Sequence, residues 1–107
     1  FACNDALAYE LAICLNAWCF DAETRAFDPA KARALTSAYQ AARPLTDAEK
    51  AALPVLARGS ALRFLLTRTF DWVNRTPDAL VTPKDPKEYA AKLRFHRSVR
   101  DAAVYGV

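Results

Sequence analysis

A single carboxylate, Glu10, lies within the most apolar stretch of the sequence, Ala6 to Phe20. An ionised carboxylate among apolar groups is costly unless it is paired or accepts backbone N–H bonds. Glu10 is therefore a candidate anchor for a backbone segment that brings hydrogen-bond donors; the alternative is that Glu10, near the start of a helix, reaches water. Asn16 is the second polar residue of this stretch, and it either bonds a neighbouring loop or contacts a ligand.

The remaining reactive side chains form no complete catalytic or metal-binding set. The chain has one histidine, no acidic pair at metal-ligand spacing, no glycine-rich phosphate loop and no serine or cysteine beside a base in the sequence. That histidine, His96, falls on the apolar side of a predicted helix, where a hydrogen-bonded core residue is the favoured interpretation. The residues alone thus predict a helical protein with no recognisable active site.

A basic stretch runs from Lys84 to Arg100, where six Lys/Arg and two Asp/Glu give a local charge of +4. Such a cluster resembles the footprint of a nucleic-acid-binding module. A solvated helix face explains it as well, since Lys87, Arg94 and Arg97 lie away from the apolar side of the predicted helix. We favour the solvated face.

Composition limits the fold class. With 107 residues, 53% hydrophobic, 25% charged and a net charge of +3, the sequence is typical of one compact domain and excludes disorder. Its 23 alanines and 12 leucines against 2 glycines favour helices and exclude an all-β fold. No apolar run approaches the roughly 18 residues of a membrane span, so we expect no membrane partner.

Two further features concern the setting of the chain. The three cysteines make an odd count, and Cys14 and Cys19 would point in different directions from one helix, so we predict buried thiols in a reducing cytoplasm. The chain begins with Phe1 and contains no methionine, which indicates a piece of a longer protein.

Capping and proline signals predict an all-α fragment of about five helices. The predicted helices are 5–20, Ala30–Ala42, a short one from the capping box Thr46–Glu49 to Leu53, Pro54 to about Arg75, and Lys87 to about Ala103. The predicted inward residues are Ala34, Leu35, Ala38 and Tyr39 in the second; Val55, Leu62, Leu65, Leu66, Thr69 and Val73 in the fourth; and Tyr89, Leu93, His96 and Val99 in the last. The first helix is apolar nearly all round, so it is either wrapped by the later helices or keeps a face for a missing upstream part.

Five stretches together resemble one known family. They are ACNDALAYELAICLNAWCF (Ala2 to Phe20), ARPLTDAE (Ala42 to Glu49), LARGSALRFLLTR (Leu56 to Arg68), VTPKDPKEY (Val81 to Tyr89) and LRFHR (Leu93 to Arg97). Over nearly all 107 residues the chain resembles the C-terminal part of the bacterial homoserine kinases of the aminoglycoside-phosphotransferase and choline-kinase superfamily. The strings Leu-Asn-Ala-Trp-Cys-Phe and Leu-Arg-Phe-His-Arg are specific to this group of homoserine kinases within the superfamily.

The resemblance implies that residues 1–107 are the C-terminal helical subdomain of a protein-kinase-like α+β fold. The implied reaction transfers the γ-phosphoryl group of ATP, with Mg²⁺, to the side-chain hydroxyl of L-homoserine in threonine biosynthesis. In that family the catalytic loop and the metal-binding motif precede the segment matched here. We therefore expect no catalytic and no metal-binding residue in this chain, ATP and Mg²⁺ bound by the upstream lobe, and a fragment that is inactive alone.

The resemblance also suggests roles for five residues. Glu10 matches the position of an acid that holds the catalytic loop through its backbone N–H groups, although the superfamily has the shorter Asp there. Asn16, Trp18, Tyr39 and Arg63 are candidate contacts for the acceptor substrate, and the Arg63 guanidinium could bind a carboxylate in a bidentate pair. The alternatives are core aromatics for Trp18 and Tyr39 and a surface charge for Arg63.

Other functions stay open on the sequence. One is a kinase of the same superfamily that acts on choline, an aminoglycoside or another hydroxyl compound. Another is a helical interaction or nucleic-acid-binding module without catalysis. If the upstream lobe is absent, exposed apolar surface predicts self-association of the fragment.

Overall fold

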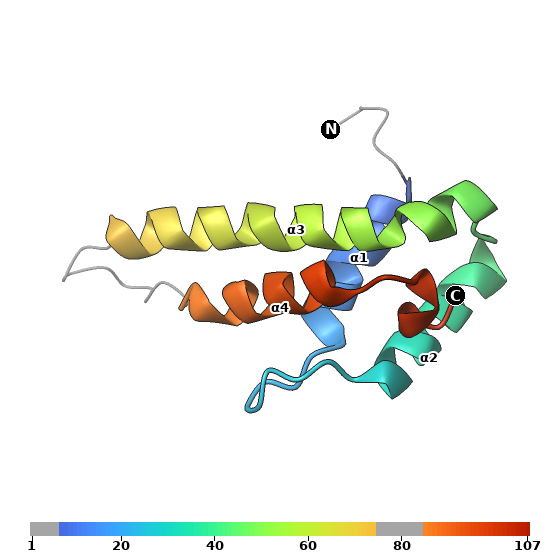
Figure 1. Cartoon of the computed structure of the whole chain (residues 1–107), viewed down its shortest axis with the longest axis horizontal. Helices are drawn as coiled ribbons and strands as arrows, with labels where there is room; N and C mark the ends of the chain where they lie inside the picture. Colours follow the sequence, from blue (N-terminus) through green and yellow to red (C-terminus); the bar gives the residue numbers. More distant parts are fainter. Residues whose placement is uncertain (1–6, 75–84) are drawn as a thin grey trace.

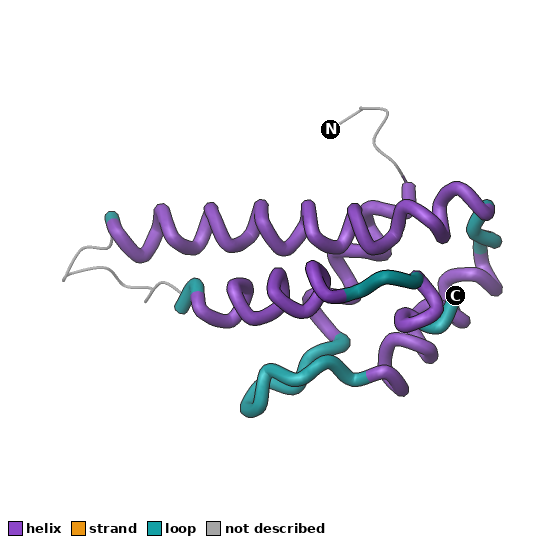
Figure 2. Tube along the Cα trace, viewed as in Figure 1, coloured by secondary structure: helices purple, strands orange, loops and turns teal. Residues whose placement is uncertain are grey.

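A computed structural model describes residues 7–74 and 85–107, and these residues fold as helices and loops without a named strand. The elements are α1 (Leu7–Trp18), α2 (Pro29–Ala42), α3 (Asp47–Val73), α4 (Lys87–Ser98) and the 3₁₀ helix η1 (Ala102–Tyr105). In Figure 1, α3 and α4 run side by side in opposite directions, and α1 crosses behind them. Figure 2 shows the long loop that joins α1 to α2. The predicted all-α class is confirmed.

Local capping explains where α2 and α3 begin. The Asp28 carboxylate accepts hydrogen bonds from the Ala30 and Lys31 backbone N–H groups at 3.0 and 3.1 Å, with Pro29 in the first turn, as predicted. The predicted capping box also forms, since the backbone N–H of Glu49 donates to the Thr46 hydroxyl at 3.1 Å.

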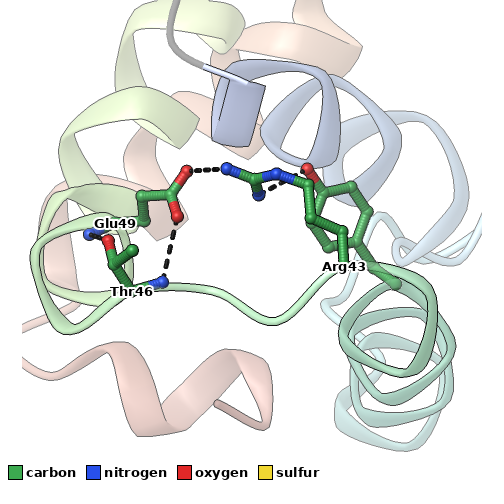
Figure 3. A network of polar contacts seen from close by, with 4 residues as sticks. Arg43, Thr46 and Glu49 are labelled. Atoms are coloured by element: carbon green, nitrogen blue, oxygen red, sulfur yellow. Dashed lines mark hydrogen bonds and ion pairs between the residues drawn. The ribbon is translucent and has the colours of Figure 1, made fainter.

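The same capping box joins α2 to α3. The Glu49 carboxylate accepts the Thr46 backbone N–H at 2.9 Å and pairs with the Arg43 guanidinium at 2.6 Å (Figure 3). Arg43 follows the last residue of α2, and Glu49 lies in the first turn of α3. One carboxylate therefore fixes both the start of α3 and its position beside the end of α2.

The prediction of two helices separated at Pro54 is wrong, because α3 runs unbroken through that proline. Proline removes one intrahelical hydrogen bond and crowds the preceding turn, at a cost of about 3 kcal/mol in a helix interior. Leu53 and Ala57, on either side of it, are fully buried. The core contacts of both flanking turns keep the two halves in one helix.

The prediction of the inward face of α3 is also wrong. The small residues Ala57, Ser60 and Ala61 are buried, whereas most of the predicted inward set faces solvent. The exposed members of that set are Val55, Leu62, Leu66, Thr69 and Val73. Small side chains let α3 approach α1 and α4 closely, and close approach decides the buried face here over bulk.

The prediction of the inward face of α2 is also partly wrong. Ala32 and Thr36 are buried and Leu35 is half-buried, but Ala34 and Ala38 are exposed. The Thr36 hydroxyl donates to the Ala32 carbonyl at 2.9 Å and lies 3.0 Å from the Tyr105 carbonyl. The buried side of α2 is therefore the side that packs on α1 and η1.

The last predicted helix is shorter than expected. α4 ends at Ser98, and Asp101 starts η1 by accepting the Ala103 backbone N–H at 2.9 Å. Gly106 ends η1 at φ 91°, and a Cβ there would meet the Arg33 Cα at 2.8 Å. The break returns the chain to the core, and Tyr89, His96 and Val99 are buried as predicted.

Only one side of α1 is buried, and this side forms the centre of the core. Its buried residues Ala8, Leu11, Ala12 and Leu15 face the other helices, and the core continues at Cys19. Ala17 is exposed on the opposite side, and Trp18 is exposed at the C-terminal end of the helix. Of the two expectations for this helix, complete wrapping by the later helices is therefore wrong within the described residues.

Two smaller predictions concern cysteines and membranes. Cys14 and Cys19 carry free thiols; Cys19 is buried as predicted, whereas Cys14 is only half-buried. Burial raises the pKa of the Cys19 thiol to about 11, and Cys3 lies outside the described residues. None of the described helices combines the length and apolar character needed to cross a bilayer.

Replacing Pro54 by alanine should stabilise the chain. The change restores a backbone N–H inside α3 and removes the clash with the preceding turn, against a smaller loss from a more flexible unfolded chain. We expect a gain of roughly 1–2 kcal/mol in the free energy of unfolding, measured by urea denaturation. Pro44→Ala, in the link before α3, is the control and should give no such gain. An unchanged or lower stability of Pro54→Ala would contradict the explanation.

Candidate functional site

The centre of the described structure is a chain of polar side chains that links four helices. Asn16 of α1 and His96 of α4 are fully buried, and the Asn16 Oδ1 lies 2.7 Å from the His96 Nε2. The Asn16 Nδ2 donates to the Ala57 carbonyl of α3 at 3.2 Å. The His96 Nδ1 lies 2.8 Å from the hydroxyl of Tyr105 in η1. We call Asn16, His96 and Tyr105 the buried triad.

The bonds of the buried triad have one consistent direction. Because the Asn16 amide nitrogen donates to Ala57, its Oδ1 is an acceptor, so the His96 Nε2 carries the proton. The His96 Nδ1 then accepts from the Tyr105 hydroxyl. Each hydrogen bond along this path has one donor and one acceptor, and the neutral imidazole is the form that satisfies both neighbours.

Electrostatics favour the same protonation state. Burial, with the positive charges of Lys92 and Arg58, lowers the pKa of His96 from 6.5 to about 4. Burial also raises the pKa of the Tyr105 hydroxyl far above its ordinary value. At neutral pH the imidazole and the phenol are thus both uncharged, which suits a structural network.

A buried lysine completes this centre. Lys92 of α4 is 5% exposed, and its ammonium group donates to the Asn16 backbone carbonyl. The same ammonium lies 4.4 Å from the centroid of the Tyr89 ring and 5.5 Å from that of Phe20. The aromatic faces stabilise the buried charge.

Sequence reasoning identified part of this centre. It placed His96 in the core, which is confirmed, and it left Asn16 between a structural and a ligand role. It missed Lys92, which it counted among the charges of the basic stretch, and it missed Tyr105. The sequence does place a tyrosine nine residues after its only histidine. This spacing brings the two side chains together only because the chain turns between α4 and η1.

The Glu10 side chain lies on the exposed side of α1, in its first turn. Within the described ranges it has no hydrogen bond or ion pair. In the described residues the Glu10 carboxylate is exposed, and its anchoring role stays a prediction.

The other candidate residues lie apart in different settings. Trp18 is 70% exposed at the end of α1, whereas Asn16 two residues earlier is buried. Tyr39 is half-buried on α2, and its hydroxyl accepts from the Arg43 guanidinium at 3.1 Å. Arg63 is exposed on α3 with its guanidinium 5.4 Å from the centroid of the Phe64 ring. Trp18, Tyr39 and Arg63 thus come from three different helices.

Two surface hollows border α4. One, of about 700 Å³, lies between α3 and α4, and we call it the α3/α4 groove. The other, of about 260 Å³, is lined by Ala22, Arg25, Arg68, Asp85 and Glu88. Arg68 and Glu88 form an ion pair across the second hollow, so its charges are partly neutralised.

The described residues offer no site for a divalent cation. Residues 7–74 and 85–107 contain no group of three His, Cys, Asp or Glu side chains that could hold a metal ion. Mg²⁺ in proteins is bound through carboxylates together with phosphates and water. This part of the chain does not fit the metal of a phosphoryl-transfer reaction, so we derive no metal-dependent step from it.

The described residues form a helical segment whose core contains the neutral buried triad. They contain no complete set of catalytic side chains. No family model matches the chain. Its whole length is similar to part of curated homoserine kinases: 62% identical to that of Gluconacetobacter diazotrophicus, 64% to that of Parvibaculum lavamentivorans and 60% to that of Rhodospirillum rubrum. The chain spans 33% of the length of each of these three. The resemblance to homoserine kinases is therefore confirmed.

Stability should fall with acid because of His96. Between pH 6.5 and about 4 the unfolded chain binds a proton that the folded chain excludes, so stability is full above pH 6.5 and decreases as the pH falls through this window. We expect a loss of roughly 3 kcal/mol in the free energy of unfolding between pH 7 and pH 4. Urea denaturation followed by circular dichroism at four pH values measures it.

The matched variant for this measurement is His96→Gln. The glutamine amide can both donate and accept but does not titrate, so the variant should lose most of the pH dependence in this window. Carboxylates with a low pKa, such as Asp21 and Glu49, act equally in both proteins. Equal pH slopes for the two proteins would show that His96 is not held neutral by the fold.

Proposed function

We propose that this chain is the helical part of a homoserine kinase, an enzyme that transfers the γ-phosphoryl group of ATP to the side-chain hydroxyl of L-homoserine. The single observation that supports this proposal is the 60–64% identity to homoserine kinases across all 107 residues. The longer protein, which we call the parent, would carry out this step of threonine biosynthesis in the cytoplasm, where ATP is available and thiols such as Cys14 stay reduced.

Within the parent, the chain would form the C-terminal helical subdomain of a protein-kinase-like fold. ATP and Mg²⁺ would be bound by the upstream lobe. The homoserine hydroxyl oxygen would lose its proton and bond to the γ-phosphorus, while the bond between the γ-phosphorus and the β,γ-bridging oxygen breaks and ADP leaves with that oxygen. On this proposal the isolated chain is inactive and has apolar surface on which it can self-associate.

Glu10 is proposed to support the catalytic loop of the parent. Its carboxylate lies on the exposed side of α1, so it is available to an added segment without rearrangement of the helix. Backbone N–H groups of such a segment could donate to the carboxylate and fix the loop. Glu10 would act as a positioning residue, since it holds other groups and does not touch the substrates.

We propose that the exposed or half-buried candidate residues contact the acceptor substrate, homoserine. Trp18 offers an exposed apolar ring, Tyr39 a phenol, and Arg63 a guanidinium suited to the homoserine carboxylate. Asn16 is fully buried with its amide bonded to Ala57 and His96, so it would act by holding α1 in place.

The activity is tested with the full-length parent. ADP release, followed by a coupled assay, should depend on both ATP and L-homoserine, and the product should be the phosphate monoester of the homoserine hydroxyl. Choline and an aminoglycoside serve as competing acceptors and should give no turnover above background. Turnover of choline or the aminoglycoside without turnover of homoserine would overturn the proposal.

The role of Glu10 is tested by Glu10→Gln in the parent. If the carboxylate holds the catalytic loop, kcat should fall roughly tenfold with little change in KM for homoserine, because loop geometry affects the transition state more than acceptor binding. The control Glu23→Gln removes another exposed carboxylate, in the loop after α1, and should leave kcat unchanged. An unaltered kcat in Glu10→Gln would contradict the anchoring role.

A further inference from the structure

The outer side of α3 carries a continuous exposed apolar stripe. Its large residues are Val55 at 57%, Leu62 at 45%, Leu66 at 61%, Phe70 at 69% and Val73 at 72% exposure. Their spacings of three, four and seven residues place them on one side of the helix. At 1.5 Å per residue the stripe is about 27 Å long. Contiguous apolar surface of this extent is typical of an interaction site.

The stripe continues into the α3/α4 groove. The groove is lined by Val55, Gly59 and Leu62 of α3 and by Leu93 of α4, together with three arginines. A Cβ added at Gly59 would meet nothing within 4 Å. The hollow at Gly59 therefore has room for a large side chain from outside.

The charge of the groove is of one sign. Its three arginines are Arg58, Arg97 and Arg100. The ion pairs of Arg43 with Glu49 and of Arg68 with Glu88 involve none of these three, so within residues 7–74 and 85–107 the groove arginines keep their positive charge unpaired. An apolar floor with a cationic rim is complementary to an amphipathic segment that carries acidic residues.

We propose that a segment of the parent outside this chain packs along α3, with a bulky apolar side chain above Gly59 and carboxylates against Arg58, Arg97 and Arg100. This inference rests on the proposed function, in which the chain is about a third of a longer protein, as it is of its relatives. A second copy is the less suitable occupant, because two copies joined through this surface would bring two cationic rims together.

The covering of the stripe is tested by thiol labelling. Leu66→Cys is made in the full-length parent and in the isolated chain, and maleimide labelling at position 66 is followed by peptide mass spectrometry. We expect labelling at least tenfold slower in the parent. Ser37→Cys, on the exposed side of α2, is the control and should label at similar rates in both. Equal labelling of position 66 in both proteins would overturn the proposal, as would protection that disappears on dilution, since the latter indicates a second copy.

The acidic character of the covering segment is tested by reversing the charge of one groove arginine. Arg97→Glu should lower the melting temperature of the parent by roughly 3 °C or more, and Arg94→Glu, an exposed position on α4 outside the groove lining, should not. In the isolated chain neither change should matter. Equal effects of the two changes in the parent would overturn the acidic character of the segment. Neither readout depends on turnover, so loss of the proposed activity with position 66 still protected would reject the function and leave this inference standing.

Discussion

The fold depends on the hydrogen bonds that run from Tyr105 through His96 and Asn16 to the Ala57 carbonyl. They connect η1, α4, α1 and α3, which are distant in sequence. A buried donor or acceptor left without a partner costs about 1–3 kcal/mol, so each member fixes the position of the next. A core of small and aliphatic side chains alone would tolerate rotation of these helices, whereas the buried triad specifies one arrangement.

This constraint also decides what remains on the surface. With Asn16 turned inward, the opposite side of α1 presents Glu10 and Trp18 to the outside. With the Ala57 carbonyl bonded to Asn16, the small-residue side of α3 is buried and its large apolar residues face outward. The exposed apolar surface of α3 is thus compatible with both the polar centre and the close packing of its small residues.

The sequence predicted those features of the fold that local chemistry determines. Asp28 and Thr46 start their helices through their own side chains, so short-range patterns sufficed. The face of α3 was predicted wrongly because its most apolar side is not its buried side, and only the contacts with α1 and α4 reveal that. The continuity through Pro54 likewise depends on tertiary burial of Leu53 and Ala57.

The candidate residues likewise divide into those that local sequence patterns indicate and those that only tertiary contacts reveal. His96 was recognised as a core residue from its place among apolar positions, but its partners Tyr105 and Asn16 lie 9 and 80 positions away and leave no local pattern. Lys92 looked like one more surface charge, because the sequence does not show that Tyr89 and Phe20 lie beside its ammonium group. The resemblance to homoserine kinases came from whole strings of residues, which is why it could be stated without these contacts.

Whether the buried triad holds His96 neutral is measured by the tautomer and protonation state of His96, read by ¹⁵N NMR of the histidine-labelled chain at pH 6. We expect a neutral imidazole with its proton on Nε2 and a slowly exchanging Nε2–H, because Asn16 is the acceptor and Tyr105 the donor. An imidazolium at this pH, or a proton on Nδ1, would contradict it.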